Sequence, residues 1–191
     1  MYEDFYSSPF GKFALEEEAK YIANIVEGKA LSIGCGTGII EHEIMKLKSV
    51  DIICIEKNEE MLEMARKRIR AIEGDATWLP FSNERFDAVF FITSLEFIED
   101  YKEAIKEAAR VLKKDGIMVA MLLNTESRYF KEKEKKGGYI SKNIKNKDIK
   151  KIEREIKKYF DARGEYFLCI NMKKRCRKEE KALYVIKGKK I

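Results

Sequence analysis

Three alternating glycines follow a short apolar run near the start of the chain, and an acidic residue ends the next apolar run. The segment 30–39 reads ALSIGCGTGI, with Gly34, Gly36 and Gly38 at alternate positions. Without Cβ atoms, glycines let a strand-to-helix turn tighten and bring backbone N–H groups against a ligand. Glu56 lies 22 residues after Gly34, where a carboxylate can accept hydrogen bonds from both hydroxyls of a ribose. Together they predict a site for a nucleoside-containing cofactor.

The spacing of the glycines narrows the kind of cofactor. It is GxGxG, whereas a dinucleotide site uses GxGxxG to place a glycine and a helix end at a pyrophosphate. Nicotinamide-dependent reduction is therefore disfavoured. Taken alone, the turn could be only a tight connection and Glu56 only a surface residue at a strand end, but their spacing favours binding.

A third polar segment, GDATWLPF, follows a short apolar run. Asp75 could accept a hydrogen bond from the exocyclic amine of a purine, and the Ala76 N–H could meet a ring nitrogen. Trp78, Leu79 and Phe81 offer apolar walls. The alternative is a loop with an Asp turn and a Trp packed in the core. The segment follows the third apolar run, just as the glycine turn follows the first and Glu56 ends the second. This order predicts an adenine site.

These residues need a framework, and apolar runs alternate with amphipathic segments to supply one. Strands are expected at 30–33, 52–55, 70–73, 86–92 and 117–123. Helices are expected at 14–26, after Gly38, from Asn58 and at 101–112. Continuous apolar strands between amphipathic helices predict a parallel sheet covered on both faces.

The alternation loosens after residue 124. Residues 125–147 are rich in lysine and contain a Gly-Gly pair, which predicts a loop or excursion. A helix is expected at 148–160, and strands at 165–171 and 182–187 could close one sheet edge as an antiparallel pair. A basic segment separates these two strands.

Composition bounds the class of protein. The chain has 191 residues, 45% of them hydrophobic, which suits one domain with a sizeable core. Its apolar runs are too short for a membrane span and its first residues form no basic, apolar leader, so a cytoplasmic protein is expected. Charged residues make up 38% and glutamine is absent, a bias typical of proteins from thermophiles.

The four cysteines show no metal or disulfide signature. Cys35, Cys54, Cys169 and Cys176 form no CxxC pair, so neither a zinc site nor a disulfide framework is expected. Cys35 and Cys54 lie in or beside predicted core strands, where a thiol behaves as a small apolar group.

Charge is divided unevenly along the chain. Residues 1–125 hold 16 basic against 23 acidic residues, and residues 126–191 hold 23 against 10. The basic part could face an anionic substrate or nucleic acid. The favoured interpretation is that its lysines solvate exposed helices and loops.

Five motifs, in this order and spacing, resemble those of the class I S-adenosylmethionine-dependent methyltransferases, most closely the small-molecule, type 11-like group. The motifs are LSIGCGTG at 31–38, Ile55-Glu56 with Met61-Leu62 and Ala65, GDATWLPF at 74–81, FDAVFFITSLEFI at 86–98 and RVLKKDG at 110–116. The resemblance implies an α/β fold, a Rossmann-like three-layer sandwich with a seven-stranded, mostly parallel sheet in the order 3-2-1-4-5-7-6 and helices on both faces. It also implies one methyltransferase domain over 1–191, with an N-terminal lid and helix (1–28), a cofactor-binding core (29–124) and a substrate-side excursion with closing strands (125–191).

The resemblance further implies S-adenosyl-L-methionine as cofactor and S-adenosyl-L-homocysteine as product. The glycines would face the methionine part, Glu56 the ribose, and Asp75 with Ala76 the adenine. Ile92 and Thr93 would close over the sulfonium end. The candidate cofactor-binding residues are Gly34, Cys35, Gly36, Gly38, Glu56, Lys57, Met61, Asp75, Ala76, Ile92 and Thr93.

Two positions depart from the family pattern. Relatives usually carry Asp or Glu at the position of Ser32, where the acid helps hold the cofactor's amino group. Its loss could weaken affinity or shift that role to another group. Phe97 stands where relatives often have His, and the single histidine, His42, is interpreted as a solvated helix residue. No catalytic base and no metal ligand is therefore assigned.

The segments expected on the substrate side are the least diagnostic. Aromatic residues recur in segment 2–13, which resembles a lid but could equally pack the first helix onto the body. Arg128, Tyr129 and Tyr139 are candidates for a substrate pocket, with packing at least as favoured for the tyrosines.

The expected function is methyl transfer from S-adenosylmethionine to a small-molecule acceptor by in-line displacement. Two alternatives stay open. One is an RNA methyltransferase that uses the basic C-terminal third, and the other is a non-catalytic S-adenosylmethionine-binding protein. No membrane partner is expected, and the chain is expected to be a monomer or a weak homodimer.

Overall fold

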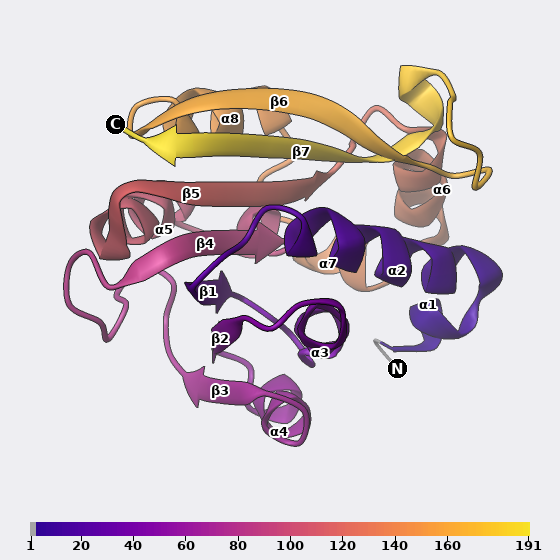
Figure 1. Cartoon of the computed structure of the whole chain (residues 1–191). Helices are drawn as coiled ribbons and strands as arrows, with labels where there is room; N and C mark the ends of the chain where they lie inside the picture. The colour runs from indigo at the N-terminus through magenta and orange to yellow at the C-terminus, as the bar shows by residue number, and fades with distance from the viewer. Residues whose placement is uncertain (1–2) are drawn as a thin grey trace.

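The structure is a computed structural model, and it describes residues 3–191. A seven-stranded sheet with the order β3-β2-β1-β4-β5-β7-β6 runs through its centre (Figure 1). The strands are β1 (Lys29–Ile33), β2 (Asp51–Glu56), β3 (Arg70–Glu73), β4 (Phe86–Ile92), β5 (Leu112–Leu123), β6 (Phe160–Cys169) and β7 (Lys181–Lys190). The helices are α1 (Asp4–Ser7), α2 (Pro9–Ala23), α3 (Ile39–Leu47), α4 (Glu59–Arg66), α5 (Tyr101–Val111), α6 (Arg128–Lys136), α7 (Tyr139–Asn143) and α8 (Ile149–Ile156), with 3-10 turns at Leu95–Phe97 and Lys178–Glu180.

Strand directions follow the predicted pattern. The strands β1 to β5 pair in parallel, and β7 lies antiparallel between β5 and β6. The α/β class, the strand order and the closing antiparallel pair are thus confirmed. Within residues 3–191 no helix is both long enough and apolar enough to cross a membrane.

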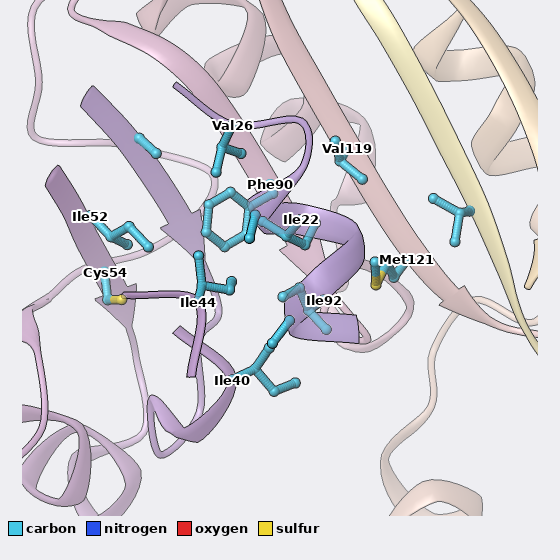
Figure 2. Close-up of a cluster of buried hydrophobic side chains, with 14 of the residues drawn as sticks. Ile22, Val26, Ile40, Ile44, Ile52, Cys54, Phe90, Ile92, Val119 and Met121 are labelled. Atoms are coloured by element: carbon cyan, nitrogen blue, oxygen red, sulfur yellow. The ribbon is translucent and has the colours of Figure 1, made fainter. Parts of the chain in front are cut away.

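Both faces of the sheet are buried, which explains why the central strands read as continuous apolar runs. Side chains alternate across the sheet, so Phe90 and Phe91 are both fully buried but belong to different core clusters. Figure 2 shows the first cluster, in which Ile22 of α2 and Ile44 of α3 lie near Phe90. On the opposite face α5 and α8 contribute side chains such as Ile105 to the second cluster. The observed layers therefore match the predicted three-layer sandwich.

The N-terminal helix is longer than the periodicity predicts. It begins at Pro9, because the Ser8 side chain caps it by accepting a hydrogen bond from the Gly11 N–H at 3.0 Å and proline suits the first helical turn. A Cβ atom on Gly11 would lie 1.9 Å from the Phe5 carbonyl oxygen, so glycine lets α1 pack closely on α2. Tyr2, the first aromatic residue of the expected lid, lies outside the described residues.

The late elements also differ from the prediction. The excursion contains two helices, α6 and α7. Helix α8 ends at Ile156, and β6 starts at Phe160, which was predicted to belong to the helix. Phe160 and Ala162 are buried while Asp161 is exposed, so the two-residue period of a strand already holds there. Phe160 lies four residues after Ile156, a spacing that fits both the helical period and the two-residue period of a strand. The hydrophobic pattern therefore misplaced the boundary between α8 and β6.

A disulfide joins Cys169, the last residue of β6, to Cys176, with the two Cα atoms 5.9 Å apart. The expectation that no disulfide is present was therefore wrong for this pair. A separation of seven residues carries no recognisable signature, and only the turn between β6 and β7 brings the two thiols together. Cys35 and Cys54 are free, and Cys54 is buried as expected.

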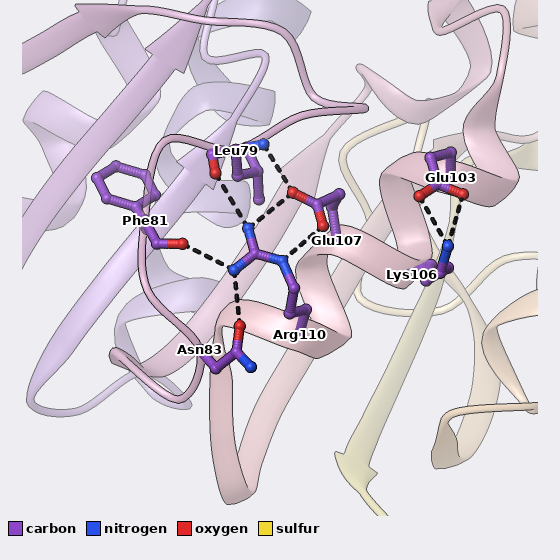
Figure 3. A network of polar contacts seen from close by, with 7 residues as sticks. All are labelled: Leu79, Phe81, Asn83, Glu103, Lys106, Glu107 and Arg110. Carbon is purple, nitrogen blue, oxygen red and sulfur yellow. Dashed lines mark hydrogen bonds and ion pairs between the residues drawn. The ribbon is translucent and has the colours of Figure 1, made fainter.

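A polar network fixes the loop after β3 against α5 (Figure 3). Arg110 donates hydrogen bonds to the carbonyl oxygens of Leu79 and Phe81 at 3.0 and 2.7 Å, and to Asn83 Oδ1 at 2.9 Å. Glu107 accepts from Arg110 and from the Leu79 N–H at 2.8 Å. One guanidinium thereby sets the path of the segment that carries Asp75 to the sheet edge.

Helix α8, which covers the same face of the sheet as α5, carries a second network. Glu153, 7% exposed, accepts hydrogen bonds from Lys150, Lys157 and Tyr184 at 2.8 to 2.9 Å. Burial opposes the ionisation of Glu153, but these donors outweigh it and lower its pKa from 4.5 to about 2.

This carboxylate should make stability depend on acid pH. Because the folded pKa lies below the unfolded one, Glu153 stabilises the fold above about pH 4.5, and this contribution is lost as the pH falls towards 2. We expect Glu153→Gln to lower the free energy of unfolding by on the order of 2 kcal/mol at pH 7 and by much less at pH 3. Urea unfolding at both pH values measures this, with the exposed Glu179→Gln as control. Equal losses at the two pH values would contradict the assignment.

Candidate functional site

A cavity of about 1090 Å³ opens at the carboxyl ends of the parallel strands. It lies where strand order reverses between β1 and β4, the usual ligand crevice of an open α/β sheet. Residues that follow β1, β2, β3 and β4 line one side, and residues of α1, α2, α6 and α7 line the other. Among residues 3–191 no cluster of three His, Cys, Asp or Glu side chains is arranged to hold a metal ion.

The cavity brings together most of the candidate cofactor residues. Eight of the eleven line it, namely Gly34, Gly36, Glu56, Lys57, Met61, Asp75, Ala76 and Thr93. Cys35, Gly38 and Ile92 do not line it. Gly38 precedes α3 with φ of 71°, and a Cβ atom there would lie 2.5 Å from Ile69 Cδ1. Its glycine is therefore explained by backbone conformation and packing.

The N–H groups of the first three residues of the glycine turn, Gly34 to Gly36, point to β2 and not to the cavity. Gly34 and Cys35 both donate to the Ile55 carbonyl oxygen, at 2.8 and 3.3 Å, and Gly36 donates to Glu56 Oε2 at 2.7 Å. The expectation that these N–H groups face a ligand was wrong. Buried N–H groups must find acceptors, and the end of the neighbouring parallel strand supplies them.

Glu56 is the centre of this arrangement. Its Oε2 accepts from Gly36, while its Oε1 accepts from the N–H groups of Lys57 and Asn58 at 2.9 and 2.8 Å. The residue is 8% exposed and lines the cavity. A carboxylate offers about four acceptor positions. Three are used within the protein, which leaves capacity for a donor on a ligand.

Asp75 is engaged on both oxygens. Its Oδ1 accepts from the N–H and hydroxyl of Thr77 at 2.9 and 2.7 Å, and its Oδ2 pairs with Lys57 Nζ at 2.7 Å. The hydrogen bonds from Lys57 and Thr77 lower the pKa of Asp75 to about 2. The Lys57 side chain is 78% exposed, so this ion pair can open at little cost.

The apolar residues after Asp75 do not wall the cavity as predicted. Leu79 is buried in the second core cluster, and the Phe81 ring packs on Phe86 at 4.9 Å. Trp78 is 76% exposed. The Arg110 network turns this part of the loop away from the cavity, a contact that the local sequence does not reveal.

Aromatic rings from the N-terminal segment, the turn after β4 and the excursion line the cavity. The rings of Phe5 and Phe10 lie 6.4 and 5.4 Å from that of Tyr129, and the rings of Phe97 and Tyr139 lie 5.8 Å apart. All five residues line the cavity. The N-terminal segment and the excursion thus form one wall. Among the remaining candidates, Arg128 is exposed, and neither Arg128 nor His42 lines the cavity.

Two buried acids, which sequence reasoning missed, lie near the glycine turn. Ser32 donates a hydrogen bond to Glu41 Oε1 at 2.6 Å, and Glu41 is 1% exposed. Glu18 of α2 is 5% exposed and lines the cavity. Burial and the nearby Glu41 charge raise the pKa of Glu18 to about 8, and burial raises that of Glu41 to about 7. Helix periodicity places both residues on helices but does not show what they face.

Comparisons with known proteins agree with this geometry. The family model described as "Methyltransferase domain" matches residues 31–120. An uncharacterized protein of Methanocaldococcus jannaschii is 33% identical over 147 residues, which cover 71% of this chain and 69% of that protein. Demethylmenaquinone methyltransferase of Staphylococcus aureus is 35% identical over 103 residues, or 49% of this chain. The match spans 42% of that enzyme's length.

Solved structures show the same architecture over nearly the whole chain. A Thermotoga maritima structure described as "SAM-dependent methyltransferase, possible histamine N-methyltransferase" aligns with a TM-score of 0.80 and 26% identity, covering 100% of this chain and 94% of that one. A "SAM dependent methyltransferase from Archaeoglobus fulgidus" aligns with a TM-score of 0.74, covering 98% and 97%, and at 21% identity it shows the fold alone. The family model and the Thermotoga maritima structure identify the chain as a member of the S-adenosylmethionine-dependent methyltransferases, with S-adenosylmethionine as its cofactor.

Proposed function

We propose that this protein transfers the methyl group of S-adenosylmethionine to a small-molecule acceptor by in-line displacement. The carrying observation is the cavity of about 1090 Å³, because the candidate cofactor residues and a set of aromatic rings line the same space. It has room for a cofactor and a second small molecule. The proposal treats residues 1–191 as one domain, in which 29–124 bind the cofactor while 1–28 and 125–191 build the acceptor side.

Six of the eight lining residues divide between the parts of the cofactor. In this proposal Glu56 uses its remaining acceptor capacity for the ribose, and Asp75 with Ala76 recognises the adenine once Lys57 moves aside. Gly34 and Thr93 lie towards the methionine and sulfonium end. Met61 lines the ribose and adenine side. Cys35, Gly38 and Ile92 support this wall from outside the cavity.

When bound, the cofactor supplies an electrophilic methyl group and a neutral thioether leaving group. The protein then needs to orient the acceptor and exclude water, and such positioning can lower the barrier by ~7 to 11 kcal/mol. The aromatic wall of Phe5, Phe10 and Tyr129 suits both tasks for a flat or apolar acceptor. Burial and the charge of Glu18 raise the pKa of Tyr129 to about 12. Its phenol therefore stays protonated at neutral pH and can donate a hydrogen bond but cannot act as a general base. An acceptor whose nucleophilic atom is already deprotonated fits best.

Methylation of RNA is the second candidate, because the basic residues concentrate in 126–191. Several of these lysines form ion pairs with acidic side chains, which lowers the charge left for phosphates. Such pairs include Lys147–Glu134, Lys157–Glu153, Lys158–Glu155, Lys178–Glu126 and Lys189–Asp115. The enclosed aromatic end of the cavity likewise favours a small acceptor.

The acceptor class can be tested directly. Purified protein with methyl-labelled cofactor is incubated with a mixed metabolite extract or with tRNA and rRNA fragments. We expect label in the low-mass fraction, and we expect Tyr129→Ala to reduce that transfer at least tenfold, because the ring that positions the acceptor is lost. Tyr101→Ala, on the far side of the sheet, is the control. Label only in RNA would support the second candidate, and no transfer in a single turnover would indicate a non-catalytic cofactor-binding protein.

The role of Glu56 can be tested through cofactor binding. We expect Glu56→Ala to weaken binding of S-adenosylhomocysteine by roughly 10- to 100-fold, since hydrogen bonds to a charged group contribute about 1.5–3 kcal/mol. Titration calorimetry measures this. Glu43→Ala is the matched control, because Glu43 pairs with Lys46 on α3 outside the cavity. Equal affinities for the two variants, both folded by circular dichroism, would refute the assignment.

A further inference from the structure

One wall of the cavity contains a carboxylate that has no cation beside it. Glu18 is 5% exposed and lines the cavity, yet it forms no hydrogen bond or ion pair with any residue of 3–191. Glu41 is 1% exposed, and its Oε2 has no hydrogen-bond partner among the same residues. A buried carboxylate without a partner costs several kcal/mol. Glu41 keeps one partner, Ser32, whereas Glu18 has none and faces the cavity, which indicates that the missing partner of Glu18 comes with the ligand.

The position of these acids relates them to the glycine turn. Helix α2 packs against α3, which brings Glu18 near Glu41. The hydrogen bond from Ser32 to Glu41 Oε1 holds Glu41 beside β1. Ser32 lies two residues before Gly34. Ser32 stands where related enzymes usually carry an acid. Here a neighbouring helix supplies the carboxylate at that place.

The surroundings select a cation as the partner. The titratable groups that face Glu18 are Glu41 of α3 and Tyr129 of α6, and Glu56 and Cys54 of β2 lie near Glu41. None of these groups carries a positive charge at pH 7. The Lys133 ammonium lies over the Tyr129 ring, 5.6 Å from its centre, and forms no ion pair with Glu18. The residues described contain no metal-binding cluster at this wall. An organic ammonium group suits it best.

We propose that Glu18 binds the ammonium group of the cofactor's methionine part, with the Ser32–Glu41 pair supporting it from behind. This inference rests on the proposed function and names the group that takes over from the missing acid at Ser32. The cofactor is preferred to the acceptor as the source of the ammonium because Glu41 contacts β1 next to the glycine turn.

Proton release provides a signature of this contact. Without ligand, burial keeps the pKa of Glu18 at about 8 and that of Glu41 at about 7, so much of the pair is protonated at pH 7. An ammonium group favours the ionised carboxylate, so binding should expel a proton and should strengthen as the pH rises from 6 to 7.5.

Titration calorimetry with two ligands separates the parts of the site. S-adenosylhomocysteine carries the ammonium group, whereas 5′-methylthioadenosine keeps the adenosine and the thioether but lacks the amino acid. We expect Glu18→Gln to weaken S-adenosylhomocysteine at least tenfold and to leave methylthioadenosine within twofold. In two buffers of different ionisation enthalpy, proton release at pH 7 should fall in the variant. Glu16→Gln, exposed on the same helix, is the matched control.

Each outcome decides a separate point. If S-adenosylhomocysteine binds wild type and Glu18→Gln equally, or if the variant changes only the KM of the acceptor, the assignment of Glu18 is wrong. If neither ligand binds wild type, the proposed function fails first. Should Glu18→Gln not fold, Glu18→Asp serves in its place. It keeps the charge at shorter reach and should retain part of the preference for S-adenosylhomocysteine over methylthioadenosine.

Discussion

The architecture of the site depends on one carboxylate. Glu56 ends β2 and holds three backbone N–H groups, one of them from the glycine turn that follows β1. This contact joins the ends of two parallel strands and sets the wall between them. Because Gly34 and Cys35 also donate to the Ile55 carbonyl, the turn is tied to β2 over two residues. The cavity therefore has a rigid side before any ligand arrives, which is the preorganisation that binding requires.

The opposite side of the cavity is assembled differently. Helices α1 and α2 come from the start of the chain and α6 and α7 from the excursion, and aromatic contacts such as Phe10 with Tyr129 join them. This wall carries the rings of Phe5, Phe10, Tyr129 and Tyr139 together with the unpartnered Glu18. The cofactor side, which lies within the residues that the family model matches, thus faces a wall built from segments outside them. That division explains how the cofactor can be assigned while the acceptor stays a proposal.

Much of the cofactor half could be predicted from local pattern. Continuous apolar strands predicted the parallel sheet, and the GxGxG spacing with Glu56 predicted part of the site. The resemblance of the five motifs to one family implied the strand order and most of the lining residues. Three of the errors share a physical cause, since each concerns a contact of the folded chain that the local pattern does not show. The N–H groups of Gly34 to Gly36 face acceptors on β2. Arg110 donates hydrogen bonds to the carbonyl oxygens of Leu79 and Phe81. Cys169 forms a disulfide with Cys176 across the turn between β6 and β7. Helix α8 was overextended because residue 160 fits two periods at once.

By itself, the sequence determined the fold class, because strand burial and helix periodicity are local properties, and it indicated the family and the cofactor through five motifs whose order and spacing resemble those of known methyltransferases. Only the tertiary structure decided which side chains face the cavity. In the sequence, Glu18 and Glu41 look like ordinary acids on amphipathic helices. Their role becomes visible only in the fold, where α2 packs on α3 and Ser32 donates a hydrogen bond to Glu41. Whether a buried carboxylate has a partner is a property of the folded molecule, because it depends on which groups all the other segments place beside it.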